Sequence, residues 1–146
     1  MSRSAIEDLV HLYADAVVHR DGDQWSATWD AEGVWELGQD RRVEGRKAIY
    51  ELWNTAIDGF NAVVQNVLNG TVELDDPAGT GTGRWYILEH WQRINGDRGI
   101  LLAYYNDTYV RRDGRWLFAS RELVPQYSGS PDLSAPFLNA WSQPDN

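Results

Sequence analysis

The hydrophobic pattern of this 146-residue chain changes its period once, near residue 62, and that change constrains the fold more than any other feature. Before residue 62, apolar side chains recur every three or four positions, as they do on one face of a helix. Beyond it, apolar and polar side chains alternate, as they do in strands with one buried face. The chain is therefore expected to fold as helices followed by an antiparallel sheet, in the α+β class.

The two periodicities place a series of helices and strands along the chain. The expected order is a helix at 4–20, a short helix at 23–29, a strand at 34–37, a helix at 45–59, and long strands at 62–75, 80–93, 99–112 and 115–126. In the short helix, Trp25 and Trp29 are four residues apart and therefore share a face. Tight turns such as Asp113-Gly114 join the long strands, which predicts an antiparallel meander.

A long twisted sheet that wraps a layer of helices leaves a cone, and the mouth of the cone is a natural internal pocket. Residues 1–128 are expected to form this single domain. Residues 129–146 contain three prolines and are expected to form an irregular tail.

Composition excludes several classes of function. The formal net charge of −9 leaves no basic surface for nucleic acid, and no apolar run is long enough to span a membrane. The chain has no Cys and only three His, without metal-ligand spacing, so neither a metal nor a cofactor is expected. The first residues lack the features of an export signal, so a cytoplasmic location is expected.

Eight tryptophans are the one oddity of the composition. Trp25 and Trp29 are expected to fill the core. Trp35, Trp53 and Trp85 lie on surfaces that turn toward the cone, and we expect them to form the wall of an apolar pocket.

Several short motifs, in their order and spacing, resemble the nuclear transport factor 2-like superfamily and, within it, the SnoaL-like polyketide cyclases. The matching segments, which lie within residues 4–128, include Tyr13-Ala14-Asp15-Ala16, Gly33-Val34-Trp35-Glu36-Leu37, Glu44-Gly45-Arg46-Lys47-Ala48-Ile49, Thr82-Gly83-Arg84-Trp85-Tyr86 and Tyr105-Asn106-Asp107-Thr108-Tyr109. The resemblance implies the cone shared by scytalone dehydratases, dehydrochlorinases and ketosteroid isomerases. It specifies fold better than function, because one fold hosts many functions.

The resemblance also shows which chemistry is missing. Val18 stands where the dehydratase branch has an Asp, and Gln65 stands where that branch has a His, although Asn69 is kept. Leu37 replaces the Asp base of the isomerase branch. Gln cannot take up a proton near neutral pH, and Val has no group that could. Val18, Gln65 and Asn69 are therefore expected to contact a substrate rather than transfer its proton. They could equally be structural.

Other positions retain candidate chemistry. Tyr13 matches a hydrogen-bond donor of the isomerases and Asn106 falls near their second donor, so the two are expected to stabilise an oxyanion. The resemblance to bile-acid dehydratases and the strand alternation place Ile87 and Glu89 inward, and Glu89 is the expected base. If the alternation is offset by one residue, His90 lines the pocket instead. Tyr13 and Asn106 could also serve only the core and a cross-strand pair.

Three hypotheses follow. The first is a cofactor-independent lyase or isomerase acting on a hydrophobic carbonyl-bearing or polycyclic molecule. The second is a non-catalytic module that binds an apolar ligand. The third, compatible with both, is a homodimer formed through the outer face of the sheet, as the resemblance implies, with Tyr86, Tyr104 or Trp116 at the interface. Asp107 is expected to pair with an Arg across the sheet, in a structural role.

Overall fold

A computed structural model describes residues 2–141 of the chain. Within these residues the elements are α1 (Ser2–His19), α2 (Gly22–Ser26), β1 (Trp29–Glu36), β2 (Arg42–Glu44), α3 (Arg46–Ile57), β3 (Phe60–Asp75), β4 (Thr80–Arg93), β5 (Arg98–Arg112) and β6 (Arg115–Gly129). All of the described helices are too short or too polar to cross a membrane.

The six strands form one sheet in the order β2-β1-β6-β5-β4-β3. The strands β3, β4, β5 and β6 pair antiparallel with their chain neighbours, so the predicted meander is confirmed. The pairing of β1 with β6 is parallel, and it was not predicted. Neither was β2, which pairs with the end of β1.

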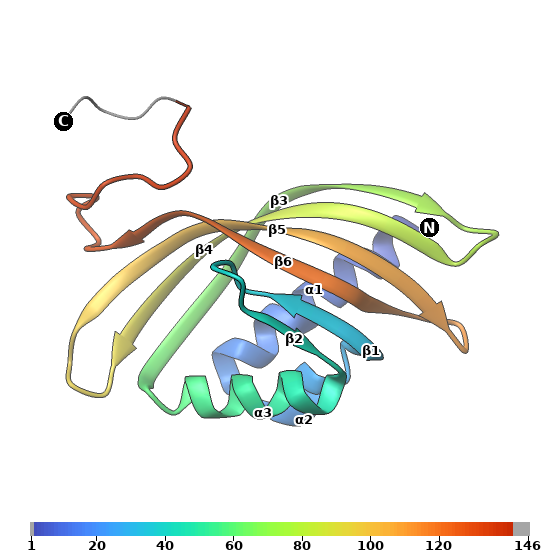
Figure 1. Ribbon diagram of the computed structural model, residues 1–146, viewed down its shortest axis with the longest axis horizontal. Helices are drawn as coiled ribbons and strands as arrows, with labels where there is room; N and C mark the ends of the chain where they lie inside the picture. The colour runs from blue at the N-terminus through green and yellow to red at the C-terminus, as the bar shows by residue number, and fades with distance from the viewer. Residues whose placement is uncertain (1, 142–146) are drawn as a thin grey trace.

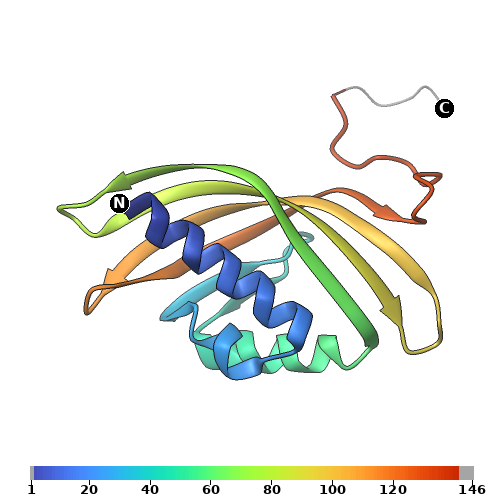
Figure 2. The same ribbon diagram turned by 180° about the vertical axis from the view of Figure 1, so that it is seen from behind.

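The sheet is strongly curved and does not close on itself (Figures 1 and 2). Helix α1 lies along its concave side, and α2 and α3 lie at the lower edge of the same side. Ile6, Val10, Tyr13 and Val17 are spaced three or four residues apart, so α1 presents them together to the sheet, where all four are buried. The expected α+β cone is therefore the observed architecture.

The second helix is shorter than predicted, and this moves one tryptophan to a different element. The Asp21 side chain caps α2 by accepting a hydrogen bond from the backbone N–H of Gln24, and the helix ends at Ser26. Trp29 is therefore the first residue of β1, where it pairs with Phe118 of β6. The prediction that Trp25 and Trp29 share a helix was wrong because a long-range strand pairing takes over there.

Four tryptophans nevertheless meet in the core between α2, α3 and β1. Trp25 and Trp53 stack with ring centroids 4.6 Å apart, and Trp35 lies 5.4 Å from Trp25. Trp29 packs 5.9 Å from Trp25. All four are buried, so this cluster anchors the two short helices to the sheet.

Two of the bulges in the sheet decide which side chains near the site face the helices. One extra residue lies in β3 between Val67 and Gly70, and another lies in β6 between Phe118 and Ser120. A bulge bends its strand and reverses the inward and outward alternation beyond it. Both bulges therefore contribute to the curvature of the sheet and to the identity of the buried residues.

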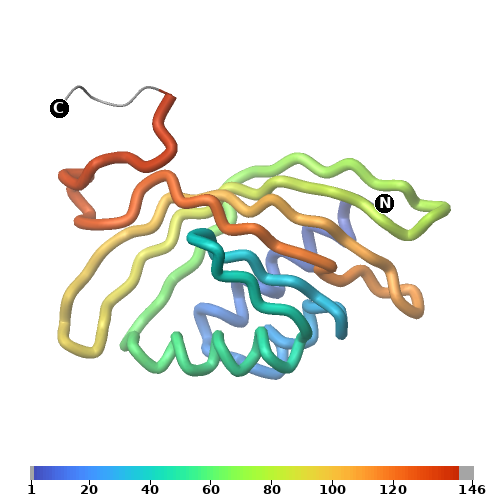
Figure 3. Tube along the Cα trace, viewed as in Figure 1, coloured from blue at the N-terminus to red at the C-terminus, as the bar shows by residue number. Residues whose placement is uncertain are grey.

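The chain beyond β6 runs across the outside of the sheet and then away from it (Figure 3). Residues 130–141 contain neither helix nor strand. The backbone N–H of Leu138 donates to the carbonyl oxygen of Gln126, and Phe137 packs against Tyr127 with ring centroids 5.2 Å apart. Residues 142–146 of the expected tail lie outside the described residues.

Candidate functional site

The concave face of the sheet carries a line of polar side chains beneath α1. They come from four strands and from the helix, and they are Tyr13, Gln65, Glu89, Tyr105, Asp107, Tyr109 and Arg121. Polar groups inside a protein are retained when they find partners, and each of these has at least one.

Glu89 lies on the inner face of β4, beside the buried Ile87. The Gln65 side-chain amide on β3 donates a hydrogen bond to Glu89 Oε1 over 3.1 Å, because the two residues are directly paired across the strands. Burial raises the pKa of the Glu89 carboxyl, and the hydrogen bond from Gln65 opposes the rise only in part. The prediction that Glu89, and not His90, faces inward is consistent with this geometry.

Tyr13 and Tyr105 bring two hydroxyl groups together near the middle of the concave face. Their oxygens are 3.4 Å apart, with Tyr13 on α1 and Tyr105 on β5. Burial raises the pKa of both hydroxyls, so both stay protonated at neutral pH. Since one hydroxyl donates to the other, the pair retains one proton that can be donated to a third oxygen.

Below this pair lies a fully buried ion pair between β5 and β6. Arg121 donates from Nε to Asp107 Oδ1 over 2.7 Å and from Nη2 to Oδ2 over 3.2 Å. The guanidinium carbon lies 3.7 Å from the centre of the Tyr105 ring and 4.4 Å from that of Tyr13. Burial alone would lower the pKa of Arg121, but the Asp107 carboxylate, together with the Tyr13 and Tyr105 hydroxyls, more than offsets this effect, so the pKa is raised. The expected pairing of Asp107 with an Arg across the sheet is confirmed.

Tyr109 and Trp85 extend the hydrogen-bond network from Asp107 to β4. The Tyr109 hydroxyl donates to Asp107 Oδ2 over 2.9 Å, and the Trp85 indole N–H donates to the same Tyr109 hydroxyl over 2.9 Å. Gly83 makes room for this arrangement, because a Cβ at that position would meet the Tyr109 ring. The network fixes Trp85 as a hydrogen-bonded residue of the core.

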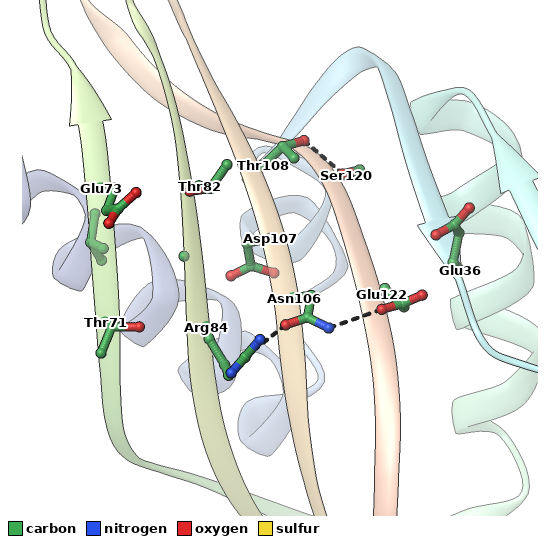
Figure 4. A pocket seen from close by; sticks show the side chains of 12 residues that line it. Glu36, Thr71, Glu73, Thr82, Arg84, Asn106, Asp107, Thr108, Ser120 and Glu122 are labelled. Carbon is green, nitrogen blue, oxygen red and sulfur yellow. Dashed lines mark hydrogen bonds between the residues drawn. The ribbon is translucent and has the colours of Figure 1, made fainter.

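The structure places Asn106 on the opposite side of the sheet from Tyr13. Asn106 accepts a hydrogen bond from Arg84 Nε and donates one to Glu122 Oε1, each over 2.9 Å (Figure 4). Its neighbours Tyr105 and Asp107 point inward, so the pleat turns Asn106 outward. The prediction that Asn106 and Tyr13 converge on one oxygen was wrong, and the second hydroxyl near Tyr13 belongs to Tyr105.

Three further predicted contacts also lie outside the concave face. His90 is exposed because it follows the inward Glu89. Val18 is 37% exposed, while the adjacent Val17 takes the buried position on α1. Asn69 lies in the β3 bulge and is exposed, because the extra residue there breaks the alternation that begins at Gln65.

The predicted wall residues Trp35, Trp53, Trp85 and Ile87 are all buried and belong to one hydrophobic cluster. Four cavities with volumes from 430 to 940 Å³ open on the surface of the described residues. One of them, of 520 Å³, lies on the outer face over Arg84, Asn106 and Glu122 (Figure 4). None of these four cavities is lined by Tyr13, Gln65 or Glu89.

Arg121 is the principal site residue that sequence reasoning missed. Trp116 and Phe118 are buried, and a regular alternation from them would turn Ser120 inward and Arg121 outward. The extra residue in β6 reverses this order, so Arg121 is inward and 1% exposed. Trp116 is also buried, with 9% of its surface exposed. The prediction that it lies on the outer face of the sheet was therefore wrong.

The concave face therefore combines one carboxyl whose pKa is raised with two neutral hydroxyls and a paired cation. Such a set can accept a proton from carbon and donate a hydrogen bond to an oxygen that gains charge. Among residues 2–141, no three or more His, Asp or Glu side chains form a group able to hold a metal ion.

Comparison with known proteins places the chain in a family. The chain is 27% identical over 131 residues to the gamma-hexachlorocyclohexane dehydrochlorinase of Sphingobium indicum, covering 86% of this chain and 81% of that protein. A scytalone dehydratase-like structure from Novosphingobium aromaticivorans superposes with a TM-score of 0.83 at 19% identity, covering 99% of this chain and 95% of that one.

A third comparison leads to the same fold. The LinA crystal structure superposes with a TM-score of 0.81 at 23% identity, covering 95% of this chain and 94% of that one. The SnoaL-like domain matches residues 1–122. The chain therefore belongs to the SnoaL-like domain family.

Proposed function

We propose that this protein is a cofactor-independent lyase or isomerase that transfers a proton on a hydrophobic, carbonyl-bearing or polycyclic molecule. Glu89 removes the proton from carbon. The Tyr13–Tyr105 hydroxyl pair donates a hydrogen bond to the oxygen that becomes negatively charged.

The observation that carries the proposal is the setting of Glu89. Its carboxyl lies on the concave face, its pKa is raised by burial, and a single amide hydrogen bond from Gln65 orients it. A carboxylate with a raised pKa is a stronger base than an exposed one. Gln65 has no proton to exchange at neutral pH, so it holds Glu89 in one orientation without competing for the substrate proton.

The hydroxyl pair supplies the second requirement. Proton removal next to a carbonyl leaves negative charge on oxygen, and a neutral donor in a water-poor site stabilises that charge. The Arg121 guanidinium beneath the Tyr105 and Tyr13 rings adds a positive field on the same side. The names of the similar proteins, a dehydrochlorinase and a dehydratase, denote eliminations, which also remove a proton from carbon.

The experiment measures proton transfer without knowledge of the natural substrate. Bicyclic and polycyclic ketones, such as 2-tetralone, are incubated with the protein in D₂O, and exchange of the protons next to the carbonyl is followed by NMR. Wild-type protein should accelerate exchange of at least one ketone, and Glu89→Gln should slow it by about 10²–10⁴-fold, the usual contribution of a general base. His90→Gln is the matched control on the outer face and should exchange at the wild-type rate.

A non-catalytic binding module is the second candidate function. It is favoured by Gln65 and Val18, which stand where the dehydratases that the chain resembles have a His and an Asp, so neither member of that acid–base pair is present. This candidate predicts that wild-type protein binds one of the ketones, seen as line broadening, with no acceleration of exchange. Equal exchange rates for wild type and Glu89→Gln would contradict the proposed role of Glu89.

A further inference from the structure

One tryptophan differs from all the others in its surroundings. Trp141, near the end of the described chain, is fully exposed, whereas Trp25, Trp29 and Trp53 are at most 5% exposed. Three more apolar side chains of the same segment are also largely exposed, namely Leu133 at 47%, Phe137 at 48% and Leu138 at 43%. A Trp offers about 150–250 Å² of surface for burial, so such a segment is typical of an interaction site.

A cavity suited to an indole lies on the helical side of the molecule. We call it the helix–hairpin cavity; its volume is 430 Å³ and it is lined by Ala5, Asp8, Leu9, Leu12, Gln24, Ala27, Thr28, Gly114, Arg115, Trp116 and Leu117. Pockets that take small aromatic molecules have volumes of about 300–1,000 Å³. Leu12 on its wall is 49% exposed, so an apolar surface there lacks a partner.

The exposed tail and the cavity lie at opposite ends of the molecule. In both ribbon views the tail leaves one end of the long axis, while the β5–β6 turn and the first half of α1 lie at the other (Figures 1 and 2). A tail held against Pro125 and Gln126 cannot reach the cavity of its own copy. Only a second copy can bring the two surfaces together.

The two surfaces offer one complementary pair of charges, Arg115 on the rim of the cavity and Asp132 in the tail. Residues 111–115 of the hairpin contain three Arg and one Asp, in a chain whose net charge is −9. Residues 130–141 contain one Asp and no Lys or Arg. Arg111 and Arg112 pair with Asp76 and Asp30, whereas Arg115, on the cavity rim, forms no ion pair within residues 2–141.

We propose that residues 130–141 of one copy dock into the helix–hairpin cavity of a second copy, with Trp141 as the buried anchor. Asp8 on the rim accepts the indole N–H, and Arg115 faces the acidic tail. Because the two contacting surfaces differ, the contact is head-to-tail and builds a closed ring or an open chain of copies.

The first experiment measures self-association of the full chain by sedimentation velocity over a range of concentrations. Wild-type protein should associate, and Trp141→Ala and Leu12→Glu should each weaken association by about thirtyfold or more, the effect expected for a central Trp anchor. Val18→Glu is the matched control, since it adds the same charge to α1 at an exposed residue outside the cavity. A wild-type chain that remains monomeric at the highest attainable concentration would overturn the proposal.

The second experiment locates the tail, and it is unambiguous because the chain has no Cys. An Ala140→Cys copy, labelled with nitrogen-15, is mixed with an unlabelled copy that carries Ala5→Cys in the cavity lining and is oxidised, and the products are identified by mass. A mixed disulfide is expected. An Asn66→Cys copy, on the outer face of β3, should form none. Preferential linkage to Asn66→Cys would place the tail on the outer face and refute docking in the cavity.

Discussion

Along β4, β5 and β6, the two faces of the sheet both carry charged side chains, but in opposite surroundings. On the inner face, the side chains of Arg121 and Asp107 are 1% and 0% exposed, and the Arg121 guanidinium lies against aromatic rings. On the outer face, Arg84, Asn106 and Glu122 form a hydrogen-bonded row in contact with water (Figure 4). Both sets of side chains come from the same strands, so the difference in their burial depends only on the face of the sheet to which they point.

This difference decides what each set of charges contributes. Breaking a buried ion pair leaves an uncompensated charge in a medium of low polarity, which is strongly destabilising. Exposed pairs keep their hydration and contribute little. We therefore expect the inner face to govern both stability and chemistry, and the outer face to tolerate change.

The largest effect is expected from breaking the buried pair. Arg121→Met leaves the Asp107 carboxylate buried without its cation, and it should lower the free energy of unfolding by about 3–5 kcal/mol in urea titrations. Arg84→Met, the matched change on the outer face, should lower it by at most about 1 kcal/mol. Adding Asp107→Asn to Arg121→Met should restore part of the loss, and comparable losses for Arg121→Met and Arg84→Met would refute the contrast.

The next largest effect is expected from filling the space beside Tyr109. In Gly83→Ala, the new methyl group meets the Tyr109 ring, with ring carbons 3.0 Å from the Cβ position. Displacing that ring disturbs the contacts to Asp107 and Trp85, and we expect a loss of about 1–3 kcal/mol in the free energy of unfolding. Gly59→Ala is the control, since its nearest atom is 3.5 Å away. Equal unfolding midpoints for both variants would contradict this account.

The long elements were predictable because their periodicity is local. The predicted strand at 80–93 coincides with β4, and the predicted strand at 115–126 differs from β6 only at its end. By contrast, β1 was predicted only from residue 34, although it begins at Trp29. Its first residues are stabilised by Phe118 of a distant strand, and no local pattern carries that information.

The candidate site was predictable only as far as the alternation of the strands stayed regular. Glu89 and Gln65 lie on regular stretches, and their inward orientation follows from their neighbours. Asn69 lies in one bulge and Arg121 follows another, and the extra residue in each bulge reverses inside and outside. The position of a bulge depends on packing across the sheet, so a single sequence does not reveal it.

Tyr13→Phe tests what a single hydroxyl group on the inner face contributes. It removes the partner of Tyr105 and should lower the free energy of unfolding by about 1 kcal/mol, while slowing ketone exchange by about 10²–10³-fold, as expected for an oxyanion donor. Tyr104→Phe, on the outer face, should change neither quantity. A Tyr13→Phe variant that loses stability but exchanges ketones at the wild-type rate would assign the hydroxyl to the core alone.

The smallest effect is expected from the pH dependence of stability at Glu89. Burial raises the pKa of Glu89 in the folded chain, so the folded state holds its proton more tightly than the unfolded state. The stabilisation from this proton is complete below the pKa of the unfolded chain and is lost as pH rises through the higher folded pKa. Because Glu89→Gln resembles the protonated form at every pH, its stability relative to wild type should increase between about pH 4 and pH 8. Urea titrations of both proteins across that range test the sign, and a relative stability that falls with pH would show that Glu89 is held as a carboxylate in the folded protein.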